Sequence, residues 1–328
     1  MTLRRTLSAL SLSLCLGAAA PAAASSAQEE RSAVPETPQT TPDPSDTPNA
    51  ATLPPLGPDV RLYFTTFNVF RWNPLGLESQ NRLILQKRLY EGQSLLTRDN
   101  FVNGGVSLKA NPAALKVGPV VEFQPLAILN LRATYEYVRF MGTMGFLQSY
   151  GDPRMDFSDD ARSLTEGRSY STSGHHYIVE PTLQAKFGSI VVRSKASVEY
   201  WNMDLREGSA ATFYDPLLDT LVPGRGWVFT NDSDLLMLAT PQLTVGARFS
   251  AVWPRYTDRM GPGAAEVDNS HMRVGPLLAY AFTTREGTAF NKPTLLVHAS
   301  WYLKHPNRVG LVPYMIAGFA FTSDILGG

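Results

Sequence analysis

The sequence has almost no cysteine, no surplus of charge of either sign, and no long apolar run beyond its N-terminus. Its one cysteine, Cys15, lies within an apolar N-terminal stretch, so disulfides and thiolate metal sites cannot hold the later residues together. Lys plus Arg number 29, as do Asp plus Glu, which argues against the basic footprint of a nucleic-acid-binding protein. After residue 27, no apolar run reaches the ~20 residues that a membrane-spanning helix needs.

Known catalytic signatures are also missing. The chain has no Gly-x-Ser-x-Gly elbow, no phosphate-binding loop and no His-Glu-x-x-His motif. His176 and Glu180 could serve as a base and its orienting carboxylate, but the sequence reveals no nucleophile for them. We therefore predict no catalytic residue, no cofactor and no metal site.

Two segments are expected before the folded part. An arginine pair, the apolar stretch from Leu7 to Ala20 and the small residues that follow are typical of a cleaved secretory signal peptide, which we place at residues 1–27. Prolines then recur among Thr, Asp, Ser and Glu through residues 28–58. Such a composition predicts a disordered, extended periplasmic linker, because it cannot bury enough apolar surface to fold.

From residue 59 onward, apolar and polar residues alternate in long runs. In residues 129–137 one face carries Leu, Leu, Ala, Tyr and Tyr, and the other carries Asn, Arg, Thr and Glu. A period of two predicts strands with one apolar and one polar face. We expect strands at 60–70, 81–92, 101–110, 115–123, 128–140, 175–187, 190–202, 227–239, 242–254, 271–283, 293–303 and 310–322.

The connectors between these runs alternate in length. The tight turns are 124–127, 188–189 and 240–242, and the long polar connections are 141–174, 203–226 and 255–270. Short turns on one side and long loops on the other are typical of bacterial outer-membrane barrels. The 141–174 loop is long enough to fold inward as a plug or to remain outside as a receptor surface.

The chain resembles a Gram-negative outer-membrane β-barrel protein, in architecture and not as a member of a specific family. The signal segment, the linker and the alternating runs carry the resemblance. Gly318–Phe321 is also similar to the aromatic strand end that the barrel-assembly machinery recognises. The resemblance implies an all-β fold, with an antiparallel transmembrane barrel of about 12 strands over residues 59–328. It also implies the cell outer membrane as location, and its lipid bilayer and the assembly machinery as partners.

Two features favour lipid as the environment of the apolar face. A soluble antiparallel sheet would give the same alternation with its faces exchanged. Here, however, the runs reach about 13 residues, whereas strands of globular proteins usually have ~5–6. Aromatic residues also gather near the ends of the apolar faces, where rings sit at a membrane interface. They are Tyr135, Tyr137, Tyr177, Tyr200, Trp253, Trp301, Phe319 and Phe321.

The polar face predicts the lining of a lumen. By parity, the lumen-lining residues are Arg132, Glu136, His176, Glu180, Lys186, Arg193, Lys195, Glu199, Arg248 and Arg273, and the same face carries Lys109, Lys116, Glu122, Asn130, Thr134, Gln184 and His298. Basic residues outnumber glutamates in this set, so an open lumen should favour anions. If the charges instead pair across strands, they fill a closed interior.

Three functions are compatible with these observations. The first is a narrow channel for small polar or anionic solutes, or a closed barrel with a charged lumen. The second is an outer-membrane enzyme that modifies lipid or lipopolysaccharide, with His176 in its site. The third is a surface structural or adhesion protein that acts through its extracellular loops. Fold alone does not choose between them.

Overall fold

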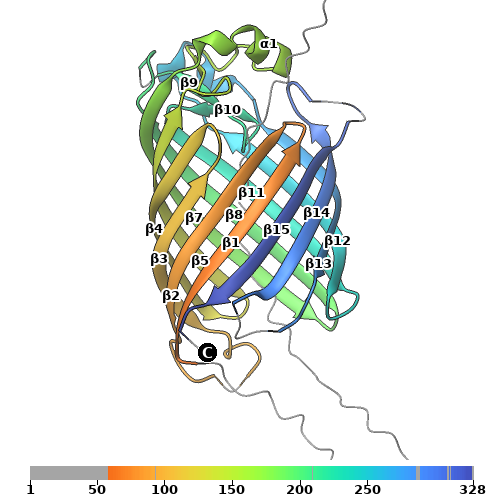
Figure 1. Cartoon of the computed structure of the whole chain (residues 1–328). Helices are drawn as coiled ribbons and strands as arrows, with labels where there is room; N and C mark the ends of the chain where they lie inside the picture. The colour runs from red at the N-terminus through yellow and green to blue at the C-terminus, as the bar shows by residue number, and fades with distance from the viewer. Residues whose placement is uncertain are drawn as a thin grey trace, which may run out of the picture.

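Twelve antiparallel strands close into a barrel. The computed structural model describes residues 58–326, apart from residues 93, 209, 286–288, 309 and 311. The expected signal peptide (1–27) and nearly all of the expected linker (28–58) lie outside the described residues. The wall has the neighbour order β1-β15-β14-β13-β12-β11-β8-β7-β5-β4-β3-β2, and its strands run obliquely (Figure 1). The expected all-β barrel of about 12 strands is confirmed.

Each barrel strand after β1 pairs with the barrel strand before it along the chain, and β15 also pairs with β1 to close the barrel. The barrel strands are β1 (Val60–Trp72), β2 (Gly76–Lys87), β3 (Phe101–Ala110), β4 (Ala114–Leu126), β5 (Leu129–Met141), β7 (Ser171–Phe187), β8 (Ile190–Met203), β11 (Arg225–Leu238), β12 (Leu243–Pro254), β13 (His271–Ala281), β14 (Asn291–Lys304) and β15 (Tyr314–Asp324). A separate small sheet has the order β10-β9-β6, formed by β6 (Ser149–Tyr150), β9 (Thr212–Asp215) and β10 (Thr220–Pro223).

The helical segments are short. They are α1 (Asp159–Leu164) and the 3₁₀ turns η1 (Glu166–Arg168), η2 (Asp258–Met260) and η3 (Ala264–Glu266). Among the described residues, no helix has the length and apolar character needed to span a membrane.

Alternation along the strands directs apolar side chains outward and polar side chains inward. On β5, Leu131 is 43% exposed, whereas the next residue, Arg132, is 7% exposed. Exposed apolar residues recur around the wall, including Leu83, Val106, Val121, Val179, Val192, Leu235 and Leu278. Soluble monomers rarely expose so large an apolar surface, and a closed barrel can meet lipid because its backbone groups pair within the wall. The outer surface is therefore a lipid-facing belt.

Exposed aromatic residues mark both ends of this belt. Trp72 ends β1 and Trp227 lies near the start of β11, at the end of the barrel that carries the long loops. Phe187, Phe282 and Phe290 lie at the opposite end, next to the short turns. Amphipathic and aromatic rings favour the two membrane interfaces, so these side chains define the two rims of the wall.

The two ends of the barrel differ in their connections, as Figure 1 shows. At the upper end, long connections follow β5, β8 and β12, and they carry α1 and the small sheet. At the lower end, β7 and β8 are joined by Gly188–Ser189 alone, and Gly188 adopts φ 60°, a conformation that glycine accepts without steric cost. The start of β1 and the end of β15 lie side by side at this lower end.

The second strand lies earlier than expected. It was expected at 81–92 but spans Gly76–Lys87, because a short turn after β1 brings Gly76 opposite Arg71. The apolar run at 83–85 hid the alternation. Ile84 points inward and is 3% exposed, while its two leucine neighbours face lipid.

Candidate functional site

The predicted lumen residues lie on the inner face of five barrel strands. Arg132 and Glu136 come from β5, His176, Glu180 and Lys186 from β7, Arg193, Lys195 and Glu199 from β8, Arg248 from β12 and Arg273 from β13. All are buried or half-buried except Lys186, which lies at the lower end of β7 and is exposed. The inner face therefore carries charges that must be balanced within the barrel.

One group of charged side chains extends along the inner face of the wall from β3 to β8. The Lys109 ammonium lies 2.6 Å from one carboxylate oxygen of Glu136. The other Glu136 oxygen lies 3.1 Å from Nδ1 of His176, whose Nε2 lies 3.0 Å from Glu199. The His176 ring also stacks on Trp201, with ring centroids 3.6 Å apart. Both ring nitrogens therefore face carboxylates, and neither is directed at a nucleophile.

A second group lies closer to the lower end. Arg132 lies 3.1 Å from Glu122 and 3.7 Å from Glu180. Lys195 lies 3.0 Å from the other oxygen of Glu180. The four side chains come from β4, β5, β7 and β8, so the pairing links four neighbouring strands.

A third group surrounds Asp234 on β11. Its carboxylate accepts hydrogen bonds from Arg193 at 2.5 Å and from Arg248 at 2.6 Å. Arg248 also lies 3.8 Å from Asp232, which accepts a hydrogen bond from Ser250. Most of the predicted lumen charges thus neutralise one another across strands, which is the arrangement of a filled interior.

A hairpin from the β8–β11 connection closes the upper part of the lumen. We call β9, β10 and the turn between them, Thr212–Pro223, the plug hairpin. All of its residues are buried except Leu217, which is half-buried. On one side, Phe213 and Val222 pack with Val138 and Trp201 of the barrel wall. The 141–174 loop pairs with the plug hairpin through β6 and β9, and its Leu147 is buried in the same core.

Barrel strands hold the main chain of the plug hairpin at its tip. Nη1 of Arg71, on β1, donates to the carbonyl oxygens of Pro216 at 2.9 Å and Leu217 at 3.1 Å. Nε2 of His271, on β13, donates to the carbonyl oxygen of Leu218 at 2.6 Å. These contacts satisfy turn carbonyls that are buried away from water, where an unpaired group would be costly.

Asp219, in the same turn, fastens the plug hairpin to the far wall. Its Oδ1 accepts a hydrogen bond from the Tyr214 hydroxyl at 2.6 Å. Its Oδ2 accepts from the Tyr302 hydroxyl and from Nε of Arg308, each at 2.7 Å. The His305 ring lies 3.2 Å from the same oxygen. Since this carboxylate joins the hairpin to β14 and to the β14–β15 connection, we call the contact the Asp219 latch.

The Asp219 latch is expected to survive mild acid. Burial alone would raise the pKa of the Asp219 carboxyl, but Arg308 and His305 outweigh it and hold this pKa well below its ordinary value. A depressed pKa means that the stabilisation is complete above the unfolded-state pKa of ~3.9 and is lost only as pH falls through the lower folded value. Amide hydrogen exchange of residues 212–223, corrected for intrinsic rates, should therefore be unchanged between pH 7 and pH 5.

Asp219→Asn removes the charge and should accelerate this exchange already at pH 7. Faster exchange of the wild-type hairpin at pH 5 would contradict the proposed role of the latch.

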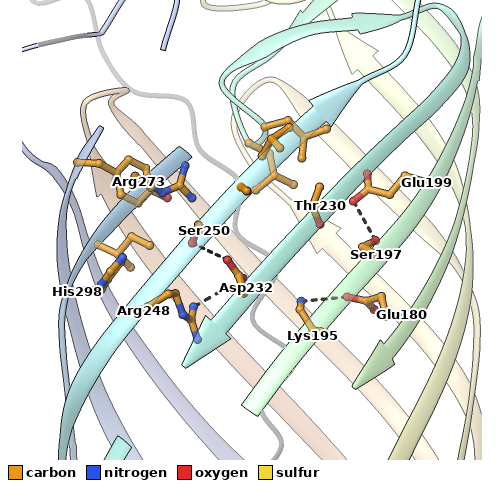
Figure 2. Close-up of a pocket in the computed structure, with 16 residues that line it drawn as sticks. Glu180, Lys195, Ser197, Glu199, Thr230, Asp232, Arg248, Ser250, Arg273 and His298 are labelled. Atoms are coloured by element: carbon orange, nitrogen blue, oxygen red, sulfur yellow. Dashed lines mark hydrogen bonds and ion pairs between the residues drawn. The ribbon is translucent and has the colours of Figure 1, made fainter. Parts of the chain in front are cut away.

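A cavity lies in the lumen beneath the plug hairpin (Figure 2). Its volume is about 70 Å³, and Leu217 and Leu218 of the hairpin border it. Arg248, Arg273 and His298 lie along one side, while Glu180, Lys195 and Glu199 lie along the other. A smaller space of about 20 Å³, also lined by Lys195, lies nearer the lower end.

One pairing considered from the sequence is wrong. His176 does not contact Glu180 but lies between Glu136 and Glu199. Residues four apart on a strand are separated by ~13 Å along it, so they cannot touch without a bend. Within the described ranges, no group of three or more His, Cys, Asp or Glu side chains is arranged to hold a metal ion.

Several residues that close the lumen were not anticipated from the sequence. Asp219 lies in the 203–226 connection, which was predicted only to be a polar loop, and Arg308 lies in the turn between the last two expected strands. A signal was nevertheless present, because the segment 212–223 is rich in apolar residues for an exposed loop. Three leucines, a phenylalanine and a valine within twelve residues predict that such a loop is buried against other protein atoms.

Comparisons with known proteins concern the architecture alone. No protein-family model and no curated protein matches the chain. Among solved structures, the β domain of the Bordetella autotransporter BrkA is 13% identical, with a TM-score of 0.39 and coverage of 80% of this chain and 99% of that one. The KdgM porin in complex with disordered oligogalacturonate is 7% identical, with a TM-score of 0.35 and coverage of 79% and 98%. Pseudomonas aeruginosa OccD3 is 13% identical, with a TM-score of 0.32 and coverage of 83% and 93%.

The wall itself decides the class. It combines an even number of antiparallel strands, a lipid-facing belt with aromatic rims and a polar interior, and its three longest connections, which follow β5, β8 and β12, all lie at one end. The chain is an outer-membrane β-barrel. In a barrel of this class the short-turn end faces the periplasm, so the plug hairpin closes the extracellular side.

Proposed function

We propose that this barrel is a narrow outer-membrane channel for small polar or anionic solutes, and that the plug hairpin closes its extracellular mouth. The observation that carries the proposal is the asymmetric attachment of the hairpin. One side is held by an apolar core and the other by the polar Asp219 latch. A purely structural barrel has no need for a closure that can be released on one side.

The apolar side supplies the lasting attachment. Phe213 is fully buried, its ring centroid 5.4 Å from that of Trp201 and 6.1 Å from that of Phe140. Leaving this core would expose several large apolar side chains to water, at ~1.5–3 kcal/mol for each one. The latch side has a smaller apolar cluster around Tyr214 and Phe157. Its other contacts are hydrogen bonds and ion pairs, which water can replace at a net cost of ~0.5–3 kcal/mol each. The hairpin is thus expected to swing on its apolar side when it opens.

Opening would change the charge of the lumen. The Asp215 carboxylate, in the plug hairpin, lies 3.9 Å from the Lys116 ammonium on β4. Movement of the hairpin takes both this carboxylate and that of Asp219 away from the wall. The open lumen is then more cationic than the closed one, and fixed positive charge favours anions.

Single-channel recording in a planar bilayer with a salt gradient tests the proposal. The wild-type barrel should be closed for most of the time and should open in discrete steps with an anion-biased reversal potential. Asp219→Asn should raise the open probability at least about tenfold, because it removes a charge-assisted contact worth ~1.5–3 kcal/mol.

Asp268→Asn is the matched control. Asp268 lies on the same rim, but its side chain is 61% exposed and contacts Lys304 and Ser270 instead of the plug hairpin. This variant should conduct like the wild type. A folded, inserted variant with residues 212–223 replaced by a short Gly-Ser turn provides the decisive case. If it also stays silent, the channel proposal is wrong and the protein is a closed barrel with a charged lumen.

A further inference from the structure

Two nitrogens of the Arg273 guanidinium have no hydrogen-bond acceptor among the residues that the structure describes. The side chain projects from β13 into the cavity beneath the plug hairpin (Figure 2). Its Nε and Nη1 atoms are buried, and within the described part of the chain neither has a hydrogen-bond partner. The guanidinium carbon lies 4.1 Å from the ring centroid of Tyr314, which supports its face but accepts none of its N–H bonds. Three N–H donors are thus left without an acceptor in a buried site.

His298 has a ring nitrogen that can accept a hydrogen bond and has no partner among the described residues. The residue is 1% exposed and lines the same cavity. Its Nδ1 lies 2.9 Å from the carbonyl oxygen of Pro276, which can only accept, so Nδ1 carries the proton of the neutral ring. Nε2 then presents a lone pair, and it has no partner among the described residues. A ligand hydroxyl or another donor can therefore form a hydrogen bond to Nε2.

The acidic side chains around the cavity already have partners. Glu180 pairs with Arg132 and Lys195, while Glu199 accepts from Ser197 and faces His176. Asp232, on the basic side, is held by Ser250 and Arg248, as Figure 2 shows. Lys195 and Arg248 pair with carboxylates, so among the Lys and Arg side chains that line this cavity only Arg273 lacks an ion pair within the described residues.

We propose that the cavity binds a small hydroxycarboxylate anion, whose carboxylate accepts from Arg273 and whose hydroxyl donates to Nε2 of His298. Such a ligand supplies both missing partners at once, which chloride or a neutral alcohol does not. The cavity, with a volume of about 70 Å³, has room for an acid of two or three carbons.

This inference rests on the proposed channel function in one respect: the bound anion is taken to be a solute that crosses the channel. Binding is therefore measured on the closed protein, without any need for conduction. A silent barrel that binds the anion would overturn the channel and leave the site standing. A conducting barrel that does not bind the anion would overturn the site and leave the channel standing.

Glycolate is the probe. Acetate, which lacks the hydroxyl, and glycolamide, which lacks the negative charge, are the comparison ligands. Dissociation constants are measured by ligand-observed NMR on the detergent-solubilised, heat-modifiable full chain at constant ionic strength. Glycolate should bind at least about fivefold more tightly than acetate, and glycolamide should not compete. Arg273→Gln should weaken glycolate binding at least about tenfold, as expected for the loss of a charge-assisted contact.

Two further variants separate the site from the general field of the lumen. Arg193→Gln removes the same charge from the same lumen, but Arg193 is bound to Asp234 and does not line this cavity. It should leave glycolate binding within about twofold of wild type. His298→Asn keeps a donor for Pro276 and removes Nε2, so it should abolish the preference for glycolate over acetate.

Equal losses in Arg273→Gln and Arg193→Gln would overturn the proposal, as would equal binding of glycolate and acetate to the wild type. Should Arg273→Gln fail to fold, Arg273→Lys takes its place. It retains the charge and should keep part of the glycolate affinity, and a complete loss in that folded variant would also contradict the model.

Discussion

Replacing Glu136 with glutamine is expected to lower the free energy of unfolding of the barrel by roughly 3–5 kcal/mol, the usual cost of breaking a buried ion pair. The Glu136 side chain is 1% exposed and faces both Lys109, at 2.6 Å, and His176, at 3.1 Å. A glutamine has nearly the same shape but leaves the Lys109 ammonium without this anion. Urea unfolding in lipid vesicles, followed by tryptophan fluorescence, measures the change.

Lys186→Gln is the control for that measurement. Lys186 points the same way from a barrel strand but is exposed at the lower end, where removal of one charge should change the stability by less than about 0.5 kcal/mol. A loss of less than about 1 kcal/mol in Glu136→Gln would contradict the expectation. It would mean that water reaches Lys109 and that the interior is not as dry as its packing indicates.

Leu131→Arg is expected to destabilise the barrel by ~2–4 kcal/mol or to block its insertion, because it places a cation in the lipid-facing belt. Leu131 is 43% exposed on β5, and its side chain points away from the lumen. Heat-modifiability on gels reports whether the variant inserts, and urea unfolding in vesicles gives the size of the loss.

Leu131→Phe provides the matched change, since it alters the size of the side chain at the same position and keeps it apolar. This variant should insert and unfold like the wild type. If the arginine and phenylalanine variants behave alike, the outer face of β5 does not meet lipid.

The strand pattern was predictable because most residues of this wall see one of only two environments. Where lipid lies on one side and charged side chains lie on the other, parity determines the face, as the contrast between Leu131 and Arg132 illustrates. The pattern weakened at Ile84, which faces inward but is apolar. That single residue turned an alternating run into a continuous one and displaced the second strand by five residues.

The plug hairpin could not be predicted by the same reasoning. Thr212–Pro223 is surrounded by protein on all sides, so neither of its faces must be polar and no period of two develops. The ion pairs were also out of reach, although their members were named from parity. Which β8 side chain Glu180 meets, here Lys195, depends on the register of β7 against β8, which a single sequence leaves open.

The contact between β1 and β15 carries a consequence for the order of folding. These two strands pair over ten positions, from Tyr63 opposite Asp324 to Trp72 opposite Met315, although they lie at opposite ends of the described chain. Every other seam of the wall joins barrel strands that are consecutive along the chain, and such hairpins can form locally and quickly. Closure is the one step that must bring distant segments together, and loop-closure entropy opposes it. Until that seam forms, two long strand edges stay unpaired, so the kinetics of assembly, and the need for protection against aggregation, should be governed by this last pairing.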